Sequence, residues 1–233
     1  MINAVAGGGT LLTFPALIWI GRNPMIANAT NAVAIWPAGI SGALGFRREV
    51  ASLQRWLWLL TIPSLLGAAA GAVLMLHTPE KIFARIVPLL IGGATLLLAM
   101  QEVITRHLPH KKATVPWIVF AFTFQFAVGV YGGYFGAGMG ILMLAALGLI
   151  GLTDLHQMNG LKNVLGVCIN GVAAIYFIAR GAVVWRDALI MAIFSIAGGF
   201  LGARLARRLG RRFVRAAVVV IGVTMTIALA LHR

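Results

Sequence analysis

Long, sparsely charged apolar runs constrain the fold of this 233-residue chain more than any other feature. Six of the nine runs approach the length of about 20 residues that a helix needs to cross a bilayer core of roughly 30 Å. Apolar residues make up 61% of the chain and charged residues only 10%, whereas soluble domains hold about 45–50% and about 25%. We therefore predict an all-α, polytopic membrane protein. The runs are residues 10–21, 27–46, 56–76, 83–104, 115–130, 138–151, 158–179, 188–205 and 213–231.

Positive charge is concentrated between the apolar runs, which indicates membrane topology rather than nucleic-acid binding. The formal net charge is +14, and positively charged loops are retained on the cytoplasmic side of membranes. Six arginines from Arg204 to Arg215 are interpreted as a cytoplasmic anchor that also binds anionic lipids. His107 and His110 have no acidic or cysteine ligand beside them in the sequence, so we expect no metal and no other cofactor.

The two halves of the sequence match each other after a shift of about 131 residues. Residues 64–72, with the pattern Ser-x-x-Gly-x-x-x-Gly-Ala, fall on the same pattern at residues 195–203. This pattern is typical of a close helix-packing surface. Duplicated modules are a common plan among transporters. We predict a first module at residues 1–105, a basic linker loop at 106–114 and a second module at 115–233.

The second module begins with an apolar stretch that the first module does not match. Residues 115–130 precede the second glycine cluster, and the equivalent stretch of the first module would lie before Met1. We therefore expect that a leading helix or half-helix of the first module is missing from this chain. The alternative is a genuine loss that the fold tolerates.

The distribution of Lys and Arg selects between two topologies. If the stretch 115–151 crosses the membrane once, nine positively charged loop residues lie on each side of the membrane. If the two apolar parts of this stretch instead return the chain to the side it left, twelve of these residues lie on one side and six on the other. The positive-inside rule favours the second layout, with the loops around Arg47, Arg106 and Arg204 in the cytoplasm. The modules are then inverted copies. The short segments beside the glycines either cross fully or re-enter, and charge does not distinguish these two arrangements.

Glycines interrupt the short apolar segments at corresponding places in the two modules. Breaks of this kind are the best sequence indication of a transport site. The candidate positions are Gly8 and Gly9 in the first module and Gly138 and Gly140 in the second. Glycines there let backbone N–H groups at a helix N-terminus attract an anion. The alternative is that they serve only close helix packing.

Lys162 is the most informative single residue, because an ionisable side chain in a membrane segment is by default a functional candidate. It lies near the start of its apolar run, so the alternative is that it extends to the lipid headgroups. A one-residue insertion in the second module makes Thr30 its repeat counterpart, and Thr30 is a candidate binding residue as well. Asn31, Asn163 and Asn170 need hydrogen-bond partners in hydrocarbon. They either bridge helices or form, with Lys162, a polar cationic pocket for a small oxyanion.

Several motifs spread over both modules form a specific combination. They are Gly7-Gly-Gly-Thr-Leu-Leu-x-x-Pro15, Pro24-x-x-Ala-x-Ala-Thr-Asn31, Met158-Asn-Gly-Leu-Lys-Asn163, Asn170-x-Val-Ala-Ala and Ala182-Val-Val-Trp185. Together they resemble the sulfite exporter TauE/SafE family of membrane transporters, also called TSUP. The resemblance implies a multi-pass protein of the bacterial inner membrane that moves small sulfur-containing anions such as sulfite or organosulfonates, usually outward. It also implies a hydrophobic stretch before the first glycine cluster.

Two functions of different classes follow from these patterns. The first is an anion transporter that works by alternating access around a site at the membrane midplane between the modules, with Lys162 balancing the charge of the anion and Asn31 and Asn163 donating hydrogen bonds. The second is a membrane scaffold subunit that transports nothing and binds a partner through its arginine-rich cytoplasmic face. We do not expect an enzyme, because the apolar runs hold no Ser/His, paired-acid or metal-ligand constellation.

Overall fold

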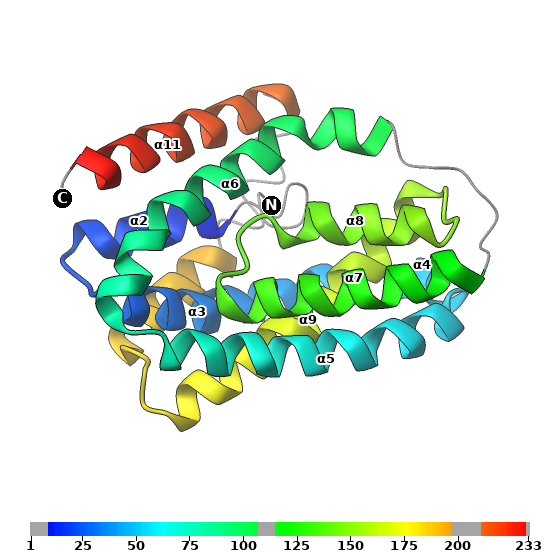
Figure 1. Cartoon of the computed structure of the whole chain (residues 1–233), viewed down its shortest axis with the longest axis horizontal. Helices are drawn as coiled ribbons and strands as arrows, with labels where there is room; N and C mark the ends of the chain where they lie inside the picture. The colour runs from blue at the N-terminus through cyan, green and yellow to red at the C-terminus, as the bar shows by residue number, and fades with distance from the viewer. Residues whose placement is uncertain (1–8, 107–114, 197–210, 232–233) are drawn as a thin grey trace.

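The structure is a computed structural model that describes residues 9–106, 115–196 and 211–231. All regular secondary structure in these residues is helical (Figure 1), which confirms the all-α prediction. Gly8, the His107 and His110 pair and the arginines from Arg204 to Arg208 lie outside the described residues. The helices are α2 (Thr10–Trp19), α3 (Pro24–Gly45), α4 (Arg47–Ala51), α5 (Gln54–His77), α6 (Glu80–Arg106), α7 (Val115–Tyr134), α8 (Met139–Leu149), α9 (Leu155–Ala179) and α11 (Arg211–Leu231), with a further helical stretch at residues 185–196.

The helices have the lengths and outward surfaces of a membrane protein. Three of the described helices, Gln54–His77, Glu80–Ile104 and His156–Ala179, are long and apolar enough to cross a membrane. Shorter apolar helices accompany them, α2 and α8 among them. Large apolar side chains also point outward, with Leu89 75% exposed and Phe194 72% exposed. An apolar exterior of this kind suits lipid and not water, so the prediction of a polytopic membrane protein is confirmed.

Similar local signals build the helix pairs α2–α3 and α8–α9. Gly21 and Gly151, with φ of 83° and 85°, end the short helices in the left-handed conformation that glycine adopts most readily. Asn23 and Asp154 then cap the long helices, each accepting a hydrogen bond of 2.8 Å from a backbone N–H two residues later. Each pair is therefore a short helix, a tight turn and a long helix.

Helix starts recur along the chain at one spacing. The helices α3 and α5 begin at residues 24 and 54, and α9 and the stretch 185–196 begin at 155 and 185, in each case 131 residues later. In Figure 1, α2 and α8 begin near the middle of the molecule and run toward opposite ends. The division into modules at residues 106–114 stays a prediction.

Contacts establish which helix ends share a face of the bundle. Ser52, just before α5, accepts a 3.4 Å hydrogen bond from Gln157 near the start of α9, so both helices begin on the side where α3 ends, called the Arg47 face. Arg22, just before α3, pairs with Asp187 at 2.6 Å; this end of the bundle is called the Arg22 face. Consequently α3 begins at the Arg22 face and α9 at the Arg47 face. Opposite directions are what inverted modules require.

Helix α7 runs parallel to α5 and α8 brings the chain back. Gln125 of α7 lies beside Ser64 of α5, and Tyr134 at the end of α7 lies beside Thr78 at the end of α5. The chain then returns through α8 to the Arg47 face, where α9 begins. The layout in which the stretch 115–151 crosses once would place Arg22 and Asp187 on opposite sides, which does not fit the ion pair between them. The orientation of the loops in the membrane stays a prediction.

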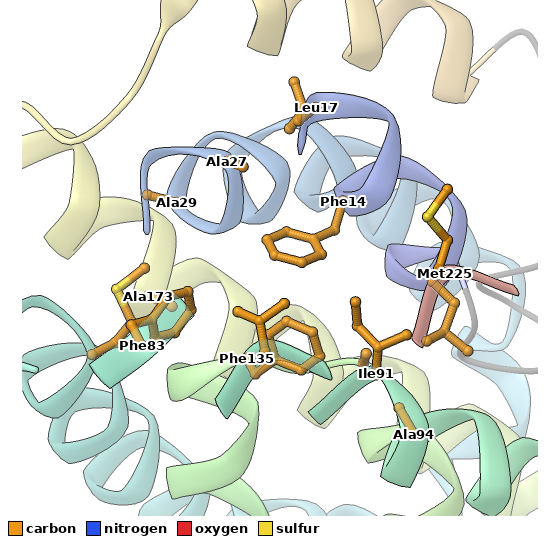
Figure 2. Packing of buried hydrophobic residues seen from close by; sticks show 14 of the residues in the cluster. Phe14, Leu17, Ala27, Ala29, Phe83, Ile91, Ala94, Phe135, Ala173 and Met225 are labelled. Carbon is orange, nitrogen blue, oxygen red and sulfur yellow. The ribbon is translucent and has the colours of Figure 1, made fainter. Parts of the chain in front are cut away.

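Glycines and aromatic rings form the interior. A Cβ atom on Gly71 of α5 would lie 2.0 Å from the carbonyl oxygen of Val130 in α7, so the two helices approach backbone to backbone and Gly71 has the packing role predicted for it. Phe14 of α2 and Phe135 of the α7–α8 turn meet edge to face, with ring centroids 5.3 Å apart. Figure 2 shows these two rings in the core together with larger side chains such as Ile91 and with alanines. The ring pair joins α2 to the α7–α8 turn.

Candidate functional site

A polar stripe runs along one side of α9. Asn159, Asn163 and Asn170 follow one another at spacings of four and seven residues, which places them on the same side of a helix, and Lys162 adjoins them. The Lys162 side chain is only 5% exposed, and its Nζ donates a 2.9 Å hydrogen bond to Oδ1 of Asn159. Such burial does not fit a lysine that extends to the headgroups. The charge is therefore held within the protein.

The first turn of α8 lies directly against Lys162. A Cβ atom on Gly140 would be 3.2 Å from Cδ of Lys162, so glycine allows the helix start and the lysine stem to touch. A helix N-terminus carries partial positive charge and adds to the field of the lysine. Within this turn the N–H groups of Met139 and Ile141 already donate to the carbonyl oxygens of Gly136 and Gly138, at 3.3 and 3.0 Å.

Asn163 carries a buried donor that nothing in the described residues accepts. Its Nδ2 has negligible exposed area and no hydrogen-bond partner. An unsatisfied buried donor costs about 1–3 kcal/mol, which an acceptor placed beside it would recover. Farther along the stripe, Asn170 donates at 3.0 Å to the carbonyl of Gly166, and its Oδ1 lies near Gly136, 3.9 Å from where a Cβ would stand.

The repeat counterpart of Asn163 has a different environment. Asn31 is 1% exposed, and its Oδ1 forms a hydrogen bond with the hydroxyl of Thr13. Its Nδ2 lies 3.4 Å from Oγ1 of Thr10. The Thr13 hydroxyl also lies 3.0 Å from the carbonyl oxygen of Gly9. Both ends of the Asn31 carboxamide are thus engaged by the first turn of α2.

Thr30 and Gly138 have positioning roles. Thr30 is 1% exposed, and its Oγ1 accepts a 3.1 Å hydrogen bond from the backbone N–H of Val184, so it ties α3 to the chain that enters the helical stretch 185–196. Gly138 caps α8 with a φ of 75° and stands against Ala94 of α6, 3.5 Å from where its Cβ would be. A residue with a side chain adopts this backbone conformation only with strain.

The predicted site residues therefore form two groups. Gly140, Lys162, Asn163 and Asn170 lie along α9 and the starting turn of α8. Gly9 and Asn31 lie where α2 meets α3. Asn31 and Lys162 each stand seven residues into their helices, or about 10 Å from opposite faces at 1.5 Å per residue. The groups thus occupy opposite halves of the bundle.

Other polar residues of the interior are missed by the sequence analysis. Asn28 of α3 donates to the carbonyl oxygen of Tyr134 at 2.9 Å, and the Tyr131 hydroxyl donates to the carbonyl oxygen of Ala137 at 2.5 Å. Both bonds hold the α7–α8 turn in place. Asn28 stands one helical turn before Asn31, a spacing that indicates a shared side of the helix. No sequence signal indicates the partner of Tyr131.

Comparisons with known proteins identify a family. The model of a family described as sulfite exporter TauE/SafE matches residues 1–229. A probable membrane transporter protein of Haemophilus influenzae is 31% identical over 228 residues, which cover 97% of this chain and 88% of that protein. The probable membrane transporter protein YfcA of Escherichia coli K12 is 28% identical over 227 residues, 97% of this chain and 83% of YfcA. The probable membrane transporter protein ORF9 of Sinorhizobium sp. is 28% identical over 230 residues, 98% of this chain and 87% of ORF9. No solved structure matches the chain significantly.

Proposed function

Because this chain belongs to the sulfite exporter TauE/SafE family and is a membrane transporter, we propose that it carries small sulfur-containing anions, sulfite or organosulfonates, across the bacterial inner membrane by alternating access. Its relatives are described as transporters and not as enzymes. The positive-inside rule supports a cytoplasmic location for the Arg47 face.

The observation that carries the proposal is the pairing of a buried cation with an unsatisfied donor. Lys162 is 5% exposed, and the next residue, Asn163, presents an Nδ2 with no partner in the described part of the chain. A lysine in a membrane helix is costly unless its charge is balanced. An oxyanion supplies a negative charge beside Lys162 and an acceptor for Nδ2 of Asn163. We therefore assign anion binding to Lys162, Asn163 and the adjoining turn at Gly140.

The same stripe favours oxyanions with several acceptors over chloride. Lys162 and Asn163 engage one end of the ligand, and Asn170 lies seven residues farther along α9, about 10 Å at the helical rise. A sulfonate places its charged head at Lys162 and its organic part toward Asn170. The Asn31 group, which is hydrogen-bonded within the protein, holds α2 to α3.

The crossing of α3 and α9 provides the pivot for alternating access. The indole N–H of Trp36 donates to the carbonyl oxygen of Val167 at 3.1 Å, and Gly39 and Gly171 let the helices touch at this point. The contact joins the two predicted modules near mid-depth. Rocking about it opens one face while it closes the other.

Transport by the purified protein in liposomes tests the proposal. Radiolabelled sulfite is loaded on one side, and its efflux is followed with and without excess unlabelled sulfite, organosulfonate or chloride. Lys162→Met should lower the rate at least tenfold, because losing a buried charge partner costs about 2–5 kcal/mol. Lys81→Met is the matched control, since Lys81 is exposed at the start of α6.

Correct folding of each variant is checked by its elution as a single species in detergent and by its retained helical circular dichroism. Equal sulfite efflux from Lys162→Met and wild-type protein would remove Lys162 from the site. Absence of any saturable sulfur-anion transport by the folded wild-type protein would refute the substrate assignment.

A further inference from the structure

An ion pair joins the two predicted modules at the Arg22 face. Nε of Arg22 lies 2.6 Å from Oδ2 of Asp187, and Nη2 lies 3.3 Å from Oδ1. The guanidinium thus reaches both carboxylate oxygens, a directional arrangement. Arg22 stands in the α2–α3 turn and Asp187 near the start of the helical stretch 185–196, which lie 165 residues apart in the sequence.

The backbone around the pair is held on both sides. Arg22 stands between Gly21, with a φ of 83°, and Asn23, whose side chain caps α3. On the other side, Val184 donates its backbone N–H to Thr30 of α3 at 3.1 Å. Hence the ion pair and a second hydrogen bond connect the same two parts of the chain. The pair belongs to a contact between helix units and is not an incidental surface pair.

At a shift of 131 residues, the predicted repeat places an uncharged residue opposite each member of this pair. The shift of 131 residues that relates the helix starts places Thr153 opposite Arg22 and Trp56 opposite Asp187. Neither residue carries a charge. At the Arg47 face the corresponding region holds the hydrogen bond of 3.4 Å between Gln157 and Ser52. Among the described residues, the two faces therefore hold different contacts between corresponding helix ends.

We propose that the Arg22–Asp187 pair is a latch that closes the Arg22 face and breaks each time this face opens. The inference rests on the alternating-access mechanism proposed above. The Arg22 side chain is 39% exposed and the Asp187 side chain 10%, so water and salt reach the pair and weaken it. A weak, directional pair on one face biases the resting conformation toward closure there and still separates within a transport cycle.

Accessibility of an introduced thiol tests the latch. The reporter is Ala182→Cys, a residue 8% exposed in the turn before Val184, in a Cys168→Ser background that lacks the native thiol. In lipid nanodiscs without substrate, a membrane-impermeant maleimide labels the reporter at a measured rate. Arg22→Gln and Asp187→Asn should each raise this rate at least threefold. The exchange Arg22→Asp with Asp187→Arg should return it toward the original value.

The matched control is Arg186→Gln, which removes an exposed positive charge adjacent to Asp187 and should leave the labelling rate unchanged. Raising the salt concentration should accelerate labelling of the reporter protein but not of its Arg22→Gln form, because only the first has a pair to screen. Equal rates in the reporter protein and both single variants would overturn the latch. So would a charge exchange that labels as fast as the single variants.

Failure of the latch is distinguishable from failure of the proposed transport function. The labelling rate needs no substrate, so faster labelling of Arg22→Gln supports the latch even if sulfite is not carried. Conversely, the protein could transport sulfite saturably while its labelling rate does not change on replacement of Arg22 or Asp187. That result would support the transport function and contradict the latch. If Asp187→Asn does not fold, Arg22→Gln and the salt dependence decide alone.

Discussion

Gly171 of α9 packs against the indole of Trp36 in α3 so closely that a Cβ atom on Gly171 would stand 3.1 Å from Nε1 of that ring. The absence of a side chain at this position lets two helices that run in opposite directions cross in close contact. Trp36 uses the same approach to donate its N–H to Val167. At this point of the crossing, Gly171 makes room for the indole of Trp36.

Enlarging Gly171 should destabilise the crossing. Gly171→Leu forces the ring of Trp36 aside, and overpacking of this kind costs about 1–3 kcal/mol, or about 2–4 °C of Tm per kcal/mol for a chain of this size. Gly42→Leu is the matched control, because a Cβ atom on Gly42 of α3 meets nothing within 4 Å. Thermal unfolding in one detergent measures both. Equal Tm values for the two variants would contradict close packing at the crossing.

Replacing Ser64 alone should destabilise the protein, whereas replacing Gln125 as well should recover part of the lost stability. Gln125 is fully buried and donates to Oγ of Ser64 at 2.8 Å, while its Oε1 has no partner in the described residues. Ser64→Ala leaves the whole carboxamide unpaired and should cost about 1–3 kcal/mol. Adding Gln125→Leu removes that unpaired group and should restore part of the lost stability.

Thermal unfolding of the four proteins of this double-mutant cycle gives the coupling between the two side chains. If the double variant is less stable than Ser64→Ala alone, the α5–α7 contact does not depend on this hydrogen bond.

Replacing Asn31 should affect mainly the stability of the protein and replacing Asn163 mainly its sulfite binding, although the repeat predicts equivalent positions for the two residues. Asn31→Leu breaks the contacts with Thr10 and Thr13 and should lower Tm by several degrees, at about 1–3 kcal/mol for groups left unpaired. Asn163→Leu removes a donor that is already unpaired and should leave Tm unchanged or raise it. It should weaken sulfite binding about tenfold or more, since a hydrogen bond to a charged ligand contributes about 1.5–3 kcal/mol.

Calorimetric titration of sulfite and thermal unfolding, applied to both variants, check this prediction. Loss of sulfite affinity in Asn31→Leu at unchanged Tm would instead place Asn31 in the binding site.

Part of the candidate site could be predicted from the sequence and part could not. Lys162 stands out as the ionisable residue of an apolar run, and the match of Asn31 to Asn163 follows from the repeat. The difference between the two asparagines is not visible in that match. It depends on Thr10 and Thr13 of α2 reaching Asn31, whereas the corresponding positions of α8 hold the apolar residues Ile141 and Leu144.

The all-α membrane fold and the close-packed role of Gly71 follow from the pattern of residues alone. Run length and apolarity suffice for the fold, because the thickness of the bilayer and the need to satisfy every backbone group favour a helix for such a run. The partners become visible in the folded protein: Val130 for Gly71, Trp36 for Gly171 and Asp187 for Arg22. These partners are distant in the sequence, and packing of whole helices brings them together, so no local pattern of residues records them.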